Sequence, residues 1–170
     1  LLKHDTGRAA VVLPDGFLFG EGVKTTLKRE LLKEFNLHTI VRLPKGVFSP
    51  YTGINTNILF IEKGGPTKQV WFYEHPYPEG YKSYSRSKPL RIEEFDAEKK
   101  WWNARKQNEH AWKVSAKEIE ERNFNLDFKN PHVEEVNHRD PEELMKEYEE
   151  ISRELGATRD ALKDELMKAL

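Results

Sequence analysis

Two short apolar runs separated by a helical pattern constrain the fold of this 170-residue chain more than any other feature. Residues 8–14 and 37–44 are rich in Val, Ile, Leu and Ala, and each run ends at a proline. Such runs predict strands buried on both faces, as in a parallel sheet. Between them, apolar residues recur at every fourth position, which predicts an amphipathic helix: Val23, Leu27, Leu31 and Phe35. Strand, helix and strand in this order indicate an α/β fold.

The following segment extends the predicted sheet. Residues 55–63 form a third strand-like run, and Gly64-Gly65-Pro66 then turns the chain. Residues 69–73 are expected to return beside this strand as its hairpin partner. Three or four strands with one crossover helix make only part of an α/β sheet, and the first residue is Leu rather than Met. We therefore expect the chain to be a piece of a longer protein.

Beyond the sheet the pattern becomes irregular. Residues 76–95 hold several prolines and predict extended, irregular chain. A helix is expected from Asp96 to Trp112, with three tryptophans buried against the sheet or a partner: Trp101, Trp102 and Trp112. Ser115 and Glu118 have the spacing of a capping box, which predicts a short helix that ends near Asn123.

The last thirty residues predict one long helix. Asp140 is the expected N-cap and Pro141 the first helical residue. Apolar residues then follow a seam with heptad-like spacing: Leu144, Tyr148, Ile151, Leu155, Thr158, Leu162, Leu166 and Ala169. The helix either packs on its own domain or joins an intermolecular bundle, and we favour the bundle. The expected domains are 1–75 for the α/β part, 76–140 for an irregular and short-helix extension, and 141–170 for the assembly helix.

Composition narrows the class of protein. The chain has no cysteine, which excludes disulfides, thiolate metal sites and cysteine nucleophiles, and fits a reducing compartment. No apolar run approaches 18 residues, so we expect no membrane partner and a cytoplasmic location. Residues 1–90 carry 13 Lys and Arg against 8 Asp and Glu, whereas residues 91–170 carry 15 against 21. The basic first half is suited to face phosphate, whereas the acidic second half would repel it. The alternative is that both halves carry ordinary surface charge.

Several familiar enzyme motifs are incomplete in this chain. Gly16, Gly20 and Gly22 match neither a dinucleotide fingerprint nor a P-loop, so a flexible turn is the better interpretation. The kinase-like triplet at 138–140 lacks the residues that must follow it. The six histidines show no metal-ligand spacing, and the sequence predicts no metal site. The chain therefore does not resemble an enzyme that is complete in itself.

One loop is an exception. Between two predicted strands, Phe48 and Tyr51 stand among polar residues that include Lys45, Thr52 and Asn55. Ligands bind outside the carboxyl ends of strands in open α/β sheets, where aromatic side chains can stack on a planar ring. The alternative is that Phe48 simply packs the loop against the core.

Separated segments resemble one known family. Residues 7–16 (GRAAVVLPDG), 43–48 (LPKGVF) and 52–59 (TGINTNIL) resemble the modification (M) subunits of type I restriction–modification systems. Those subunits are S-adenosylmethionine-dependent, adenine-specific DNA methyltransferases. The resemblance runs the whole length and includes residues 123–127 and the last helix.

The resemblance implies a fold and a set of site residues. The fold is the C-terminal part of a Rossmann-like methyltransferase sheet that ends in a β-hairpin, followed by a long α-helix. Phe48 is placed to stack on the flipped target adenine, and Pro14 and Asp15 to wall its pocket. The implied target-base and DNA-binding set is completed by Tyr51, Thr52 and Asn55.

The resemblance also implies partners. The last helix would dock on the specificity (S) subunit through Leu144, Tyr148, Ile151, Leu155, Leu162 and Leu166. The other expected partners are DNA, the restriction (R) subunit and a second M subunit.

The chain departs from the family in two motifs. The glycine-rich cofactor loop and the Asn-Pro-Pro-aromatic catalytic motif are both absent from these residues. We therefore interpret the chain as the C-terminal portion of an M subunit that alone neither binds S-adenosylmethionine tightly nor methylates DNA. Two alternatives stay open: a non-catalytic protein-interaction module, and an RNA or protein methyltransferase in which residues 77–88 contact single strands.

Overall fold

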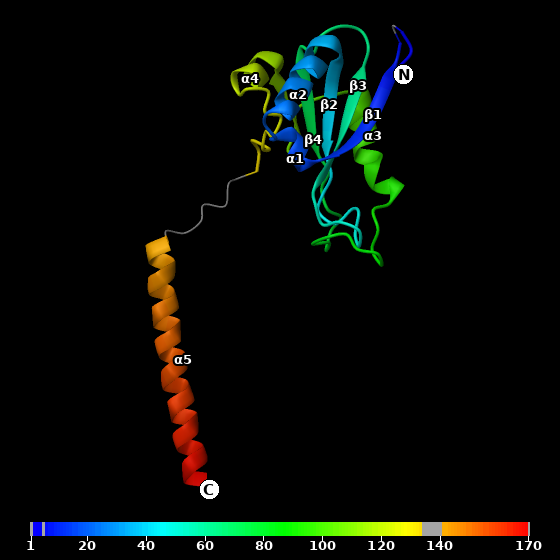
Figure 1. Ribbon diagram of the computed structural model, residues 1–170. Helices are drawn as coiled ribbons and strands as arrows, with labels where there is room; N and C mark the ends of the chain where they lie inside the picture. The colour runs from blue at the N-terminus through cyan, green and yellow to red at the C-terminus, as the bar shows by residue number, and fades with distance from the viewer. Residues whose placement is uncertain (1, 5, 134–140, 170) are drawn as a thin grey trace. The chain divides into compact units, whose positions relative to one another are not determined.

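The computed structural model describes residues 2–4, 6–133 and 141–169. The chain divides into two units, Leu1–Val133 and Glu134–Leu170. The first is a five-stranded sheet with short helices (Figure 1). In chain order its elements are β1 (Arg8–Pro14), α1 (Asp15–Leu18), α2 (Val23–Glu34), β2 (Asn36–Arg42), β3 (Thr56–Glu62), β4 (Gln69–Glu74), η1 (Ile92–Phe95), α3 (Asp96–Asn103), β5 (Ala111–Ser115) and α4 (Ala116–Glu121).

The strand order is β1-β3-β2-β4-β5. β2 and β4 pair in parallel, whereas β3 is antiparallel to both β1 and β2, and β5 is antiparallel to β4. β1, β2 and β4 therefore run in one direction, and their carboxyl ends lie at the same edge of the sheet. We call this the carboxyl edge, and the opposite one the amino edge.

The predicted hairpin between residues 55–63 and 69–73 is wrong, because β2 lies between β3 and β4. The antiparallel neighbours are β2 and β3. Thr67 accounts for this arrangement: its backbone NH donates to Leu32 O at 2.8 Å, and its hydroxyl accepts from Leu37 N at 2.8 Å. These bonds tie the turn after β3 to the end of α2 and the start of β2, so β4 begins on the far side of β2.

β1 is a strand as predicted, but it is not buried on both faces in a parallel pairing. It is antiparallel to β3, and Val11 and Val12 are 39% and 49% exposed. Among the described residues, no strand pairs with its other side. A continuous apolar run does not distinguish a central strand from one at the edge of the described sheet.

Both faces of the sheet carry a core. One core joins residues of the strands to α1, α2, α4 and the segment after α4, and includes Leu18, Leu32, Ile40, Leu59, Phe72, Trp112, Ile119 and Leu126. The other lies under α3 and includes Val41, Leu43, Tyr73, Trp101 and Ala111.

The apolar face predicted for α2 is only partly correct. Leu31 and Phe35 pack against the core, but Val23 is 77% exposed and Leu27 is half exposed. Lys28 is buried in their place. Its Nζ donates to Leu18 O at 2.7 Å and to Gly20 O at 2.9 Å, so its charge is solvated by carbonyl groups while its methylenes pack inside.

The helix predicted over 96–112 ends earlier, because α3 stops at Asn103 and Trp112 lies on β5. Trp101 and Trp112 are buried as expected, in different cores. The capping box is confirmed: the Ser115 hydroxyl accepts from Glu118 N at 3.2 Å, and the Glu118 carboxylate accepts from Ser115 N at 2.8 Å. It starts α4 next to β5.

The second unit contains α5 (Pro141–Ala169), which confirms the predicted long helix. Its expected N-cap, Asp140, lies outside the described residues. The predicted seam is exposed along the helix, including Leu144, Tyr148, Ile151, Leu155, Leu162 and Leu166. Within the described ranges, no helix is long and apolar enough to cross a membrane.

Candidate functional site

A cleft opens at the carboxyl edge, where β1, β2 and β4 end. Its volume is about 590 Å³. The side chains that line it are mostly polar and come from distant parts of the first unit: Asp15, Arg42, Lys45, Asn55, Glu74, His75, Tyr77, Glu109, His110, Asn130 and His132. The carboxyl ends of strands are the usual place for a ligand in an open α/β sheet, so this cleft is the candidate site.

Two predicted site segments meet in this cleft. Asp15, which follows Pro14 at the end of β1, donates its backbone NH to Asn55 O at 3.0 Å. The Asp15 carboxylate accepts a hydrogen bond from the buried Asn57 side chain at 2.6 Å. The residue after β1 is thus fixed against the start of β3, and Asp15 and Asn55 both line the cleft.

The loop 43–55 carries the predicted aromatic residues. Its turns are closed by bonds from Ser49 N to Gly46 O and from Tyr51 N to Phe48 O, both 2.9 Å long. Phe48 is 40% exposed and Tyr51 is 92% exposed, so the structure leaves both rings accessible. The Thr52 hydroxyl accepts from Ile54 N at 3.1 Å. Phe48, Tyr51 and Thr52 are not among the residues that line the 590 Å³ cleft.

The sequence did not indicate that the segment after α4 forms one wall of the cleft. Asp127 forms an ion pair with Arg42 at the end of β2. The Asn130 side chain donates to the Glu74 carboxylate at 3.0 Å and to Glu109 O at 2.7 Å. The sequence signal was the resemblance of residues 123–127 to the family, but it did not indicate which strand end this segment contacts.

A buried pair lies behind the cleft. His75 Nδ1 is 2.7 Å from the Glu98 carboxylate of α3, and both side chains are buried. Among the described residues, neither His75 Nε2 nor Glu98 Oε2 has a hydrogen-bond partner. This pair joins the residue after β4, which lines the cleft, to α3.

The glycine-containing turn after β1 does not form a cofactor cradle. Lys24 Nζ donates to Gly16 O at 2.9 Å, while Lys28 closes on Leu18 O and Gly20 O. A Cβ at Gly20 would lie 2.3 Å from Lys24 Cδ, so a lysine side chain occupies the space beside this glycine. Two lysine side chains of α2 therefore close the turn, and the residues of the turn do not fit the methyl donor. Nor do the described residues hold a cluster of His, Asp or Glu suited to a metal ion.

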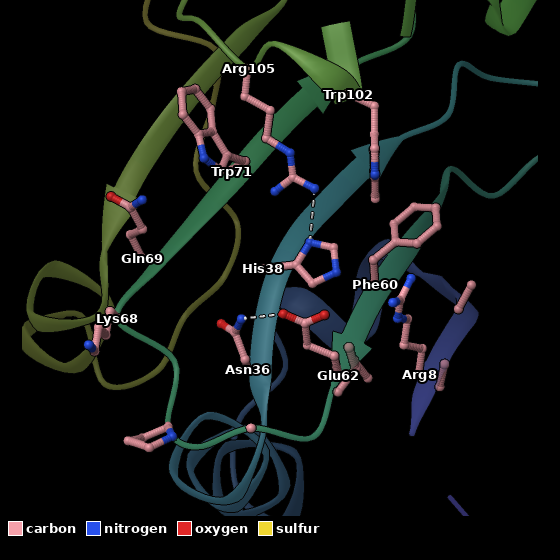
Figure 2. Close-up of a pocket in the computed structure, with 15 residues that line it drawn as sticks. Arg8, Asn36, His38, Phe60, Glu62, Lys68, Gln69, Trp71, Trp102 and Arg105 are labelled. Atoms are coloured by element: carbon pink, nitrogen blue, oxygen red, sulfur yellow. Dashed lines mark hydrogen bonds between the residues drawn. The ribbon is translucent and has the colours of Figure 1, made fainter. Parts of the chain in front are cut away.

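A second hollow lies near the amino edge, on the face of the sheet that α3 covers in part (Figure 2). Its volume is about 750 Å³, and it contains no predicted site residue. Arg105 reaches over the Trp102 ring, 4.4 Å from its centroid, and donates to His38 Nδ1 at 3.3 Å. Burial, with the positive charge of Arg105, lowers the pKa of His38. Burial also lowers the pKa of Arg105.

A mixed α/β sheet with a polar cleft at the carboxyl ends of its strands is the arrangement of many ligand-binding α/β proteins. Comparison with known families identifies the family of this chain: residues 2–140 match the family described as N-6 DNA Methylase. The chain belongs to this family. Its sheet and long C-terminal helix match those of methyltransferase subunits of known structure.

Individual relatives agree with this assignment. The chain is 58% identical to the type I restriction enzyme EcoEI methylase subunit of Escherichia coli, over 98% of this chain and 35% of that protein. It is 51% identical to a modification subunit of a putative type I restriction enzyme from Vibrio vulnificus YJ016, over 78% of this chain and 29% of that one, with a TM-score of 0.73. A chain from a study of complex assembly in the type I R-M system is 35% identical, with a TM-score of 0.73, over 97% of this chain and 37% of that one.

The resemblance to type I modification subunits that the sequence indicated is thus confirmed. The chain spans about a third of the length of these relatives.

Proposed function

We propose that this chain is the C-terminal portion of the modification subunit of a type I restriction–modification complex, an adenine-specific DNA methyltransferase. In this proposal it contributes a wall of the target-base pocket and the helix that docks on the specificity subunit. The observation that carries the proposal is the carboxyl edge, where Asp15 is fixed against Asn55 and Asn57 at the base of a loop with accessible aromatic rings. The 58% identity to a methylase subunit supports it.

Each site residue has a role suited to its chemistry. The Phe48 ring stacks on an adenine that has left the duplex, since an exposed aromatic ring offers a face to any base. Thr52 and Asn55 hydrogen-bond to polar groups of the flipped nucleotide, Tyr51 contacts DNA beside it, and Pro14 and Asp15 close the pocket wall. S-Adenosylmethionine is held by the rest of the parent protein, because the turn after β1 is closed by Lys24 and Lys28. The chain alone is therefore inactive.

The test is base flipping by the full-length protein on DNA with 2-aminopurine at the target position. Phe48→Ala is expected to lower the stability of the flipped state by about 1–3 kcal/mol and to change the 2-aminopurine fluorescence at saturation, because both the flipped population and the stacking that quenches the probe change. Phe48→Tyr keeps the ring and is the matched control, with fluorescence near that of the wild type. Unchanged fluorescence in Phe48→Ala contradicts the stacking role.

The exposed seam of α5 favours a second function, that of a protein-interaction module on an α/β scaffold. A 29-residue helix with exposed apolar residues along one stripe is typical of a helix that packs in a bundle. The two functions are compatible, because the helix and the carboxyl edge belong to different units.

A further inference from the structure

Two long loops extend beyond the carboxyl edge and carry concentrated positive charge. These loops, 43–55 and 76–91, lie side by side below the sheet in Figure 1, and we call them the loop pair. Together they contain five Lys and Arg side chains and one acidic side chain, Glu79. The five cations are all exposed: Lys45, Lys82, Arg86, Lys88 and Arg91.

The loop pair is one packed structure. The Tyr77 hydroxyl donates to Lys45 O at 3.1 Å, and Tyr84 N donates to the same carbonyl at 3.3 Å. Tyr84 is buried, and its ring lies 5.6 Å from that of Tyr77 and 5.9 Å from that of Tyr81. A tyrosine cluster therefore holds the second loop against the first, and the exposed cations are carried on a defined surface.

The cations of the loop pair are not paired with carboxylates within the part of the chain that the structure describes. Lys88 instead lies over the Tyr81 ring, 5.2 Å from its centroid. Exposed like charges on one small surface repel one another, so the clustering of these cations does not stabilise the fold. An anionic partner would remove the repulsion.

We propose that the loop pair binds the phosphate backbone of duplex DNA next to the target base. This inference rests on the proposed function, because loop 43–55 also carries Phe48. A base that stacks on Phe48 stays linked to its own strand, which brings the neighbouring phosphates to the same loop pair. Lysine and arginine side chains neutralise phosphates without reading sequence, and they fix the register of the protein on the duplex. The loop pair thus positions the duplex, and the residues at the carboxyl edge contact the target base.

The experiment measures DNA affinity of the full-length protein as a function of salt concentration, on duplexes with and without the target adenine. Replacing Lys82, Arg86 and Lys88 together by Gln is expected to reduce the slope of log K against log[salt] by about 2 to 3. The loss of affinity is expected to be equal on both duplexes. The control replaces three cations of the amino edge by Gln: Lys33, Lys63 and Lys68. The control leaves the slope unchanged.

An unchanged slope in the loop-pair variant, or an equal loss of slope in the control, overturns the proposal. If the triple variant fails to fold, as judged by its circular dichroism, Lys82→Gln alone is expected to reduce the slope by about 0.9. The result is independent of the 2-aminopurine test. If the slope is reduced and base flipping is unchanged in Phe48→Ala, the loop pair binds phosphate but Phe48 does not stack on the base. If the slope is unchanged and base flipping is altered in Phe48→Ala, only the phosphate-binding role of the loop pair is rejected.

Discussion

The Asn57 side chain donates a hydrogen bond of 2.6 Å to the Asp15 carboxylate, and this bond ties the end of β1 to the start of β3. Asn57 is fully buried on β3, whereas Asp15 is half buried and lines the cleft. β1 and β3 also pair along their whole length, from Arg8 opposite Glu62 to Pro14 opposite Thr56. The bond therefore fixes the position of a cleft residue from within the sheet.

Removal of this bond is expected to destabilise the fold. Asn57→Ala leaves the Asp15 carboxylate without its buried donor, and we expect the free energy of unfolding to fall by about 1–3 kcal/mol. Asp15→Asn keeps an acceptor oxygen at the same place and is the matched control, with a smaller loss. Urea unfolding of both variants measures the difference. Equal losses in the two variants would show that the hydrogen bond does not determine stability here.

The contact between the two loops of the loop pair depends on a glycine. Gly46 has a φ of +86°, and a Cβ there would lie 2.5 Å from Tyr84 O. Gly46→Ala is thus expected to strain the backbone and separate the loops, at a cost of about 1–3 kcal/mol. Gly53, in the same loop, has open space around its Cα and no positive φ, so Gly53→Ala is expected to be nearly neutral. Thermal unfolding with limited proteolysis of residues 76–91 compares the two, and similar behaviour would refute the close approach.

His38 is expected to make stability depend on pH. Burial and Arg105 lower its pKa in the folded protein below the ordinary value of 6.5. The unfolded chain then binds more protons than the folded protein just below pH 6.5, so the free energy of unfolding falls as the pH is lowered through this window. The stability contributed by neutral His38 is fully present above pH 6.5.

The measurement is urea unfolding at several pH values between 5 and 8 for the wild type and for His38→Gln, which offers Arg105 an acceptor that does not titrate. The wild type is expected to lose more stability than the variant as the pH falls. Parallel pH profiles would mean that His38 titrates alike in the folded and unfolded states.

The seam of α5 is expected to carry assembly and not the stability of the first unit. Ile151 and Leu155 are 58% and 56% exposed on α5, and aspartate at both positions places charge on the seam. We expect Ile151→Asp with Leu155→Asp to abolish binding of the specificity subunit, with unchanged unfolding of the sheet. Glu150→Asp with Glu154→Asp, on the same helix, serves as the control. Retained binding in the seam variant would exclude a docking role for this stripe.

The sequence predicts the local elements of this fold well. Short-range patterns of apolar residues and caps predict the strands over 8–14 and 37–44, the helix from Val23 to Phe35 and the capping box at Ser115, which correspond to β1, β2, α2 and the start of α4. These patterns are local, since a side chain and its nearest neighbours determine them. The family resemblance also came from local segments.

Long-range features could not be predicted in the same way. The Arg42–Asp127 ion pair joins residues that are 85 positions apart, and no local signal pairs them. By its residue type Lys28 is expected at the surface. It is buried because its amine donates hydrogen bonds to the carbonyl groups of Leu18 and Gly20, which the local sequence pattern does not indicate. β5 is too short to be told from the end of a helix, and only its pairing with β4 defines it.

Photocrosslinking tests the central claim that loop 43–55 receives the target base. A duplex with 5-iodouracil in place of the target adenine is bound by the full-length protein, irradiated and digested, and the crosslinked peptide is identified. Because Phe48 stacks on the flipped base in this account, the crosslink is expected at Phe48, and it is expected to disappear in Phe48→Ala. A crosslink that maps outside residues 43–55 and persists in Phe48→Ala would contradict the account.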